Sequence, residues 1–340
     1  MLIDLHAHVI PTDLPPARGR ASGDRWPRIE PAETGGARVL VSGPMRFTAR
    51  DVFYDADRRL EAMERSGVDA EVLSPMPPLL NYALPAQDGL DLARCVNEFI
   101  ARLREAAPDR FLGLGTVPLQ DPDLAARELA VIKGMGLHGV EIGSNVEGRS
   151  LGEDRFLGFF QEAERLGVPI FVHALPAPLG DRMPRSAVPS FGVGTEAALA
   201  AVSIIYGGVA ERCPGLRLAL SHGAGGFPLM LPRAQYFWGG TWNEEPPSAD
   251  RPQVPDRLPR SPSEYARRFY YDTLVFDRRA LRYLLDLIGP ERLLVGTDFP
   301  AMERERPAGR TLRSMDLPGE VLEDITWNNC FRFLGLPPPR

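Results

Sequence analysis

Short apolar segments recur along the chain and alternate with longer stretches in which apolar residues repeat with the period of a helix. Eight segments have the length and apolar content of buried strands: 2–8, 70–74, 111–117, 139–143, 169–173, 217–222, 269–274 and 293–298. Six stretches between them have the amphipathic pattern of helices: 57–66, 89–106, 123–135, 156–166, 196–211 and 278–288. Strands that alternate with helices form βαβ units with a parallel sheet. Eight such units favour a closed (β/α)8 TIM barrel over an open doubly wound sheet.

The junctions between the predicted helices and the following strands support this division. A glycine stands at the helix end in SGVDAEVL, MGLHGVEI, LGVPIFV and IGPERLLVG. Glycine readily adopts the left-handed conformation that commonly ends a helix. The recurrence of this arrangement is typical of repeated units of one kind.

Two segments interrupt the alternation. Residues 11–50 follow the first strand and are rich in Pro, Gly and Arg, which predicts a lid, as a long loop or a small hairpin, over the barrel mouth. Residues 235–263 form a Pro-rich insertion after the sixth strand. Both leave the carboxyl ends of strands, where TIM-barrel active sites form. Neither resembles an independent domain, so residues 1–340 are predicted to form a single domain.

The composition excludes several classes of partner. The net charge is -6 and the basic residues are scattered among acidic ones, so no basic stripe is available for nucleic acid. No apolar segment approaches the roughly 20 residues that span a bilayer, and MLIDLHAHVIP lacks the pattern of a signal peptide. The three cysteines, Cys95, Cys213 and Cys330, form no CxxC motif, which indicates reduced thiols. We therefore expect a cytoplasmic protein that contacts neither nucleic acid nor membrane.

Four of the five histidines stand at the ends of predicted strands. His6 and His8 share one face of the first strand because they are two residues apart. His173, His222 and Asp298 end the fifth, sixth and eighth strands. A lone HxH pair is as often structural as metal-binding, but five metal-competent groups at one end of one barrel predict a metal site. His138 falls at the other end of the barrel and is expected to be a surface residue.

The motifs around these residues resemble those of the amidohydrolase superfamily. They are DLHAH in the first strand, FVH in the fifth, LSHGAGGFP after the sixth and GTDFP after the eighth. Binuclear members bridge two metals with a carboxylated lysine after strand four, whereas strand four here is GVEIGS, and Lys133, the only lysine, lies in the preceding helix. The resemblance therefore implies one divalent metal, Zn²⁺ or alternatively Mn²⁺, with a water in the open position. It implies His6, His8, His173 and Asp298 as the ligands.

Longer segments are similar to one branch of that superfamily, the decarboxylases typified by aminocarboxymuconate semialdehyde decarboxylase. They are ARDVFYDADRRLEAMERSGVDAEVLSP, IIYGGVAERCPGLRLALSHGAGGFPLMLPR and RRFYYDTLVFDRRALRYLLDLIGPERLLVGTDFP. Resorcylate-type decarboxylases carry Glu in place of the first His, so the intact HxH favours the muconate type. The chain departs from that type at AMERERP and at PRSAVPSFGVG, which follow Asp298 and His173. The resemblance consequently does not specify the substrate.

The resemblance also implies roles for individual residues. His222 is the expected general acid/base, with a further metal ligand, or a residue that supports a ligand, as the alternative. Asp298 is expected to bind the metal and to orient its water, with a helix-capping role as the alternative. Arg46, Arg50 and Arg233 are expected to bind substrate carboxylates, because the planar guanidinium pairs with a carboxylate through two hydrogen bonds. Arg233 would come from the neighbouring subunit of a homodimer, although in so arginine-rich a chain each of these positions can also be fortuitous.

Other side chains are weaker candidates for the pocket. Phe47, Tyr82, Phe191 and Trp238 have the character of a wall around a planar substrate, with core or interface packing as the alternative. The acidic run AMERERP has the composition of a solvated loop, but its position after Asp298 lets it approach the site.

Together these features predict an enzyme. The first hypothesis is a metal-dependent, cofactor-independent decarboxylase of a small unsaturated or aromatic carboxylic acid. The same site is compatible with a hydrolase of a lactone or amide, or with hydration of a double bond. A barrel that has lost catalysis and only binds a partner is a third reading, against which the complete set of metal-competent residues argues.

Overall fold

The computed structural model describes residues 1–32, 37–43, 45–175, 183–240 and 258–337. Eight parallel strands pair in the order in which they follow one another along the chain. They are β1 (Ile3–Val9), β5 (Ala70–Pro75), β6 (Phe111–Gly115), β7 (Gly139–Gly143), β10 (Ile170–His173), β11 (Leu218–Leu220), β12 (Tyr270–Asp272) and β13 (Leu293–Leu294). The Leu5 N–H donates to Val295 O at 2.8 Å, and a parallel bridge joins Ala7 to Phe299, so the end of the sheet returns to its beginning. The predicted (β/α)8 barrel is thereby confirmed.

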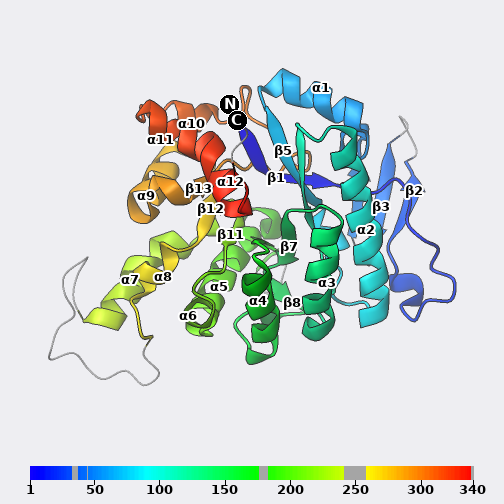
Figure 1. Ribbon diagram of the computed structural model, residues 1–340, viewed down its shortest axis with the longest axis horizontal. Coiled ribbons are helices and arrows are strands. Elements are labelled where there is room, and N and C mark those ends of the chain that lie inside the picture. Colours follow the sequence, from blue (N-terminus) through cyan, green and yellow to red (C-terminus); the bar gives the residue numbers. More distant parts are fainter. Residues whose placement is uncertain (33–36, 44, 176–182, 241–257, 338–340) are drawn as a thin grey trace.

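Helices surround the strands on the outside (Figure 1). The six predicted helical stretches correspond to α1 (Ala56–Ser66), α2 (Ala86–Ala106), α3 (Pro122–Gly134), α4 (Asp154–Leu166), α5 (Val193–Tyr206) with α6 (Val209–Arg212), and α9 (Arg278–Ile288). Asp55 caps α1 by accepting a hydrogen bond from the Arg58 N–H, and Gly67 ends that helix in the left-handed conformation. Gly167 ends α4 in the same way, as expected from the junction sequences.

Four strands, β6, β11, β12 and β13, end before the residue that the apolar pattern predicts, and two of these ends concern site residues. β11 ends at Leu220 instead of residue 222, and β13 ends at Leu294 instead of residue 298. His222 and Asp298 have φ values of 53° and 59°, so neither residue has the extended backbone of a strand. Both residues therefore lie in the loops beyond the strands.

The first insertion contains regular structure. β2 (Arg28–Pro31), β3 (Arg38–Ser42) and β4 (Met45–Ala49) form a three-stranded antiparallel sheet, which lies beside the barrel in Figure 1. The second insertion was predicted over residues 235–263. Helix α7 (Phe227–Gly239) extends into its start, and α8 (Pro262–Ala266) overlaps its end. Residues 241–257 lie outside the described residues. The pattern did not predict α7, because Pro228 and Pro232 interrupt its helical signal.

One described segment, Arg185–Tyr206, is long and apolar enough to cross a membrane by length and composition alone. Core helices of soluble proteins meet the same criterion, so this is weak evidence for a membrane span. The α5 part of the segment buries Ala198, Ala201 and Ile205 in the protein interior, as the helix of a barrel unit does.

Candidate active site

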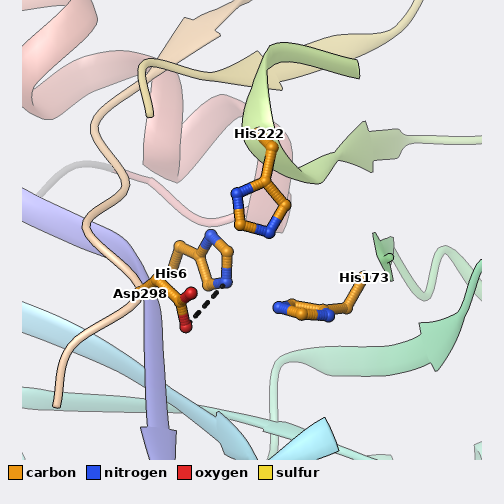
Figure 2. A group of neighbouring side chains, drawn as sticks. All are labelled: His6, His173, His222 and Asp298. Carbon is orange, nitrogen blue, oxygen red and sulfur yellow. Dashed lines mark ion pairs between the residues drawn. The ribbon is translucent and has the colours of Figure 1, made fainter. Parts of the chain in front are cut away.

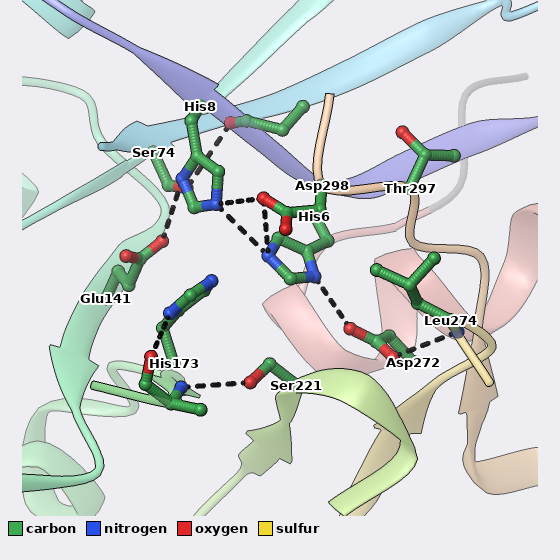
Figure 3. Close-up of polar contacts among 12 residues, drawn as sticks. His6, His8, Ser74, Glu141, His173, Ser221, Asp272, Leu274, Thr297 and Asp298 are labelled. Carbon is green, nitrogen blue, oxygen red and sulfur yellow. Dashed lines mark hydrogen bonds and ion pairs between the residues drawn. The ribbon is translucent and has the colours of Figure 1, made fainter. Parts of the chain in front are cut away.

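The first strand places two imidazoles side by side at the carboxyl end of the barrel. His6 and His8 are completely buried, and their Nε2 atoms lie 3.1 Å apart (Figure 3). His6 also packs edge-on against the rings of Phe171 and His173, with centroids 5.0 and 4.9 Å away. The two rings thus stand in contact with the end of β10, where His173 is the last residue of the strand.

The hydrogen bonds of His8 and His173 fix their tautomers. His8 Nδ1 lies 2.9 Å from Pro75 O, and His173 Nδ1 lies 2.8 Å from Ala174 O. A carbonyl oxygen only accepts hydrogen bonds, so each Nδ1 carries the hydrogen and each Nε2 presents a lone pair. In His173 this Nε2 is buried and has no hydrogen-bond partner among the described residues.

His6 is oriented by a carboxylate that the sequence did not single out. Its Nδ1 lies 2.8 Å from Asp272 Oδ2, at the end of β12, and the other oxygen of Asp272 accepts from the Gly223 and Leu274 N–H groups at 3.0 and 3.1 Å. A carboxylate that holds the outer nitrogen of a histidine is the usual support of a metal ligand. The sequence contained a signal for Asp272, which lies in FYYDTL. This is the predicted seventh strand, and no site residue had been assigned to it, although the fifth, sixth and eighth strands each carried one.

Asp298 lies opposite the histidines in a strained backbone conformation. Its Oδ1 is 3.0 Å from His8 Nε2 and 3.7 Å from His6 Nε2, and its N–H donates to His6 O at 2.8 Å. Burial opposes ionisation of Asp298, but its contact with His8 and the charge on His6 hold its pKa below the usual range. Strain of this kind persists where the surroundings fix it and is common at functional sites.

His222 lies beyond the strand end that was predicted for it. It belongs to the turn Ser221–Ala224, which brings its ring to 5.2 Å from His6 and 5.4 Å from His173, centroid to centroid. Its Nε2 is buried and, within the described part of the chain, has no hydrogen-bond partner. Burial, together with the positive charge of His6, lowers the pKa of His222 to about 4.

These residues form a centre that suits a cation. One candidate ligand atom from each of His6, His173, His222 and Asp298 lies within 4.8 Å of the others (Figure 2). Burial lowers the pKa of His6, but the carboxylates of Asp272 and Asp298 raise it by more than burial lowers it. The resulting pKa is about 9, so the centre attracts positive charge at this ring. Buried lone pairs without donors and an ionised carboxylate fit a divalent metal. The four residues whose ligand atoms lie within 4.8 Å of one another include His222, whereas the predicted ligand set has His8 in its place. His8 nevertheless contacts both His6 and Asp298.

A second buried carboxylate lies next to this centre. Glu141, on β7, is fully buried, and its Oε2 is 3.8 Å from His8 Nδ1. Burial raises the pKa of Glu141, which favours its protonated form. Glu141 lies in the fourth barrel strand, after which binuclear members carry their lysine. An acidic residue in the otherwise apolar strand GVEIG was the sequence signal that could have identified it.

The three predicted substrate arginines do not border the pocket over the histidines. Arg46, on β4, pairs with Glu30 at 2.9 Å, and Arg50 lies 3.4 Å from Glu303, both with exposed side chains. Arg233, on α7, holds its guanidinium 4.9 Å from the ring centroid of Phe237. The pocket itself has a volume of about 870 Å³, and His173, His222 and Asp298 belong to its lining.

The predicted aromatic residues are also absent from that lining. Phe47 packs against Phe53 with centroids 5.2 Å apart, and the hydroxyl of buried Tyr82 accepts from the Gly143 N–H at 2.9 Å. Trp238 donates to Leu258 O at 2.9 Å, and Phe191 is exposed. In the described part of the chain, these side chains fit the alternative of core or surface packing.

His138 differs from the expected surface position. It is half-buried between β6 and β7, and its Nδ1 accepts a hydrogen bond from the Gly113 N–H at 3.1 Å. Burial and the charge of Arg104 lower its pKa to about 4. His138 is therefore a structural residue of the barrel.

Comparison with known proteins places this geometry in a family. Residues 3–336 match the family model described as amidohydrolase. The chain is 34% identical over 340 residues to a 2-amino-3-carboxymuconate-6-semialdehyde decarboxylase of Dictyostelium discoideum, covering 99% of this chain and 92% of that protein. It is 30% identical over 260 residues to a gamma-resorcylate decarboxylase of Rhodococcus jostii (strain RHA1), covering 72% and 77%.

A solved structure shares the fold over nearly the whole chain. It is a dihydroxybenzoic acid decarboxylase from Polaromonas sp. JS666 with bound manganese and the inhibitor 2-nitroresorcinol. The match has a TM-score of 0.76 at 22% identity and covers 98% of this chain and 96% of that one. The chain therefore belongs to the amidohydrolase family, and within that family it matches the metal-dependent decarboxylases.

Proposed function

We propose that the protein is a metal-dependent, cofactor-independent decarboxylase of a small unsaturated or aromatic carboxylic acid. The observation that carries this proposal is the convergence of histidine lone pairs on Asp298 at the floor of a pocket, with the unbonded Nε2 of His222 beside them. Hydrolysis and hydration use similar centres, but the relatives that cover the chain are named decarboxylases, which favours loss of carbon dioxide.

His6, His8, His173 and Asp298 are the proposed ligands of a single Zn²⁺ or Mn²⁺. The fixed tautomers of His8 and His173 support this assignment, as does the manganese in a protein of the same fold. A divalent ion held there would supply positive charge that binds and polarises the anionic oxygens of the substrate. Asp272 would keep the ring of His6 in place for this purpose.

His222 is the proposed acid/base. Decarboxylation breaks the bond between the carboxyl group and its carbon, carbon dioxide leaves, and the carbon keeps the electron pair and takes up a proton. His222 borders the pocket and has no hydrogen-bond partner at Nε2, so it can hold a proton facing the substrate. The turn that carries it is fixed by the hydrogen bond from Gly223 to Asp272.

The proposed assembly is a homodimer in which Arg233 of one chain reaches the site of the other. The support is the surface of α7, where Leu229, Met230 and Phe237 are exposed. Large apolar side chains grouped on one helix are typical of an interface. Arg46 and Arg50 remain proposed carboxylate ligands at the mouth, and the contact of Arg50 with Glu303 ties it to the loop that follows Asp298.

We also propose a cytoplasmic role in the breakdown of aromatic or unsaturated acids. The three cysteines are free, and two of them are buried, which suits a reducing compartment. The small carboxylic acids named for the relatives suit a catabolic step.

The experiment that tests this function is turnover of purified protein loaded with Zn²⁺ or Mn²⁺. Its probes are 2,6-dihydroxybenzoate and 2-amino-3-carboxymuconate-6-semialdehyde, assayed in D₂O. The expected result is release of carbon dioxide, sensitive to chelators, with one deuterium on the carbon that carried the carboxyl group. His138→Asn serves as the control histidine variant and should keep chelator-sensitive turnover. Metal-loaded protein that hydrolyses a lactone or amide panel but decarboxylates neither acid would contradict the proposal.

A further inference from the structure

The pocket above the metal centre is larger than a monocyclic acid requires. Its volume of about 870 Å³ falls in the upper part of the roughly 300–1,000 Å³ range of sites that hold drug-sized ligands. The metal-competent side chains of its described lining are His173, His222 and Asp298, and this part of the pocket is called its floor. A carboxylate bound at that floor leaves most of the pocket for the remainder of the substrate.

The walls of the pocket are predominantly apolar. They come from the start of α5, the loop and helix after β11, the segment from the end of β12 into α9, and the loop after β13. The side chains that form them include Val193, Pro228, Leu274, Val275, Leu284 and Met302. Apolar surface buried against such walls gains free energy in proportion to its area, so the walls favour an apolar substituent.

The described lining offers little to a second carboxylate. Its one cation is Arg279, whose guanidinium is already paired with Asp277 at 2.9 Å and is almost fully exposed. An anionic group placed against the described wall of this chain would lose hydration without gaining a partner among these described residues. The charge pattern thus separates an anionic end at the floor from an apolar end along the wall.

Resting on the decarboxylase activity proposed above, we infer that the substrate is an aromatic acid with an apolar substituent, an alkyl chain of several carbons or a second ring, lying along this wall. The carboxyl group that is lost sits at the metal centre, and the substituent extends toward Leu274, Val275 and the start of α5.

Gly194 offers a way to fill the wall without disturbing the fold. It lies in α5 and borders the pocket, and a Cβ placed on it would have Gly225 Cα as its nearest neighbour, at 3.7 Å. Leucine is a better helix former than glycine, so Gly194→Leu should fold. Gly158, an exposed glycine of α4 whose Cβ would meet no described atom within 4 Å, provides the matched control Gly158→Leu.

The experiment compares 2,4-dihydroxy-6-methylbenzoate with its 6-propyl and 6-pentyl homologues in kcat/KM. It also measures binding of 5-methylresorcinol and 5-pentylresorcinol, which have no carboxyl group to lose, by calorimetry. Each buried methylene should strengthen binding by up to about fourfold, so the pentyl compounds should exceed the methyl compounds at least tenfold in both measurements. Gly194→Leu should bring the pentyl-to-methyl ratio toward one, and Gly158→Leu should leave that ratio unchanged.

Two outcomes separate this inference from the proposed function. A flat or falling ratio in wild-type protein that decarboxylates the methyl compound would overturn the apolar substituent and leave the activity standing. A ratio that survives Gly194→Leu would likewise overturn the placement along this wall. Tighter binding of 5-pentylresorcinol, lost in Gly194→Leu, with no turnover of any metal-loaded sample, would support the pocket and contradict the decarboxylase.

Discussion

Removal of the Arg304 guanidinium should destabilise the protein far more than removal of Arg306, two residues away in the same acidic run. Arg304 is buried, with its side chain only 2% exposed, and its Nη2 lies 2.8 Å from Asp4 Oδ2 and in contact with Glu71. Its guanidinium also lies 3.9 Å from the ring centroid of Phe299. Arg306 is 70% exposed and approaches Glu303 at 3.7 Å.

The magnitude follows from what Arg304→Met leaves behind. Breaking a buried ion pair by removing one partner typically costs about 3–5 kcal/mol, because the remaining charge stays buried and unmatched. Arg59 still contacts Glu71, which limits the loss to the lower part of that range. At about 2.1 cal/mol/K per residue, the entropy of unfolding of this chain is about 0.7 kcal/mol/K, so a loss of about 3–4 kcal/mol lowers the Tm by about 4–6 °C. An exposed pair such as Arg306–Glu303 contributes about 0–1 kcal/mol.

The position of Arg304 predicts a second effect, on metal binding. Thr297 is hydrogen-bonded to Asp4 and to Arg304 Nε, and Phe299 O accepts from the His8 N–H at 2.7 Å, so the residues on both sides of Asp298 are held by this cluster. Loss of an outer support typically weakens metal affinity by about 10–100-fold. Calorimetric unfolding and metal titration of Arg304→Met and Arg306→Met test both effects. Equal Tm and equal metal affinity in the two variants would refute the reasoning.

Four further predictions concern single side chains. His173→Ala should lose most of the bound metal, measured by elemental analysis of protein purified in parallel with wild type, because it removes one of four ligands; full occupancy would contradict the assignment. His222→Ala should retain metal and lose about 10²–10⁴-fold in turnover, whereas loss of metal would make His222 a ligand, as its distances allow. His138 is neutral in the fold because its pKa is lowered from 6.5 to about 4, so its contribution to stability is complete above pH 6.5 and is lost as the pH falls toward 4. Urea unfolding of wild type and of His138→Gln, each at pH 7.5 and pH 5, should show that acid destabilises wild type by about 1–2 kcal/mol more than the variant. An equal loss of stability in the two proteins would disprove this prediction. Arg233→Ala and His222→Ala, each inactive alone, should partly restore activity when their subunits exchange, and confirmed exchange without recovery would eliminate the shared site.

Much of the barrel was predictable because its signals are local. Helix period, apolar strand segments and terminal glycines such as Gly67 depend on a few neighbouring residues. The strand ends at His222 and Asp298 were not, since their positive φ values arise from tertiary contacts. Neither His nor Asp indicates a left-handed backbone from its residue type alone, and the apolar pattern of the predicted strands extends to both positions.

The site was predictable to the same degree. The strand-end histidines and Asp298 were found from their spacing, and the structure brings them together. Asp272 and Glu141 were missed because the sequence does not show which histidine ring each carboxylate faces in the folded barrel. Arg304 was taken as part of a solvated loop, since composition cannot show that Arg304 turns inward while Glu303 and Arg306 of the same run stay exposed.

The centre and the closure of the barrel depend on the same backbone. β13 contributes only two residues to the sheet, and, besides the hydrogen bond from Leu5 to Val295, links between the end of the barrel and β1 run through the site. The Asp298 N–H donates to His6 O, the His8 N–H donates to Phe299 O, and Asp4 accepts from Thr297. A cation bound between His6, His8 and Asp298 would therefore cross-link the first and last strands at their junction. Because binding to the folded state alone adds to its stability, the metal should act on the closure of the barrel as well as on the chemistry.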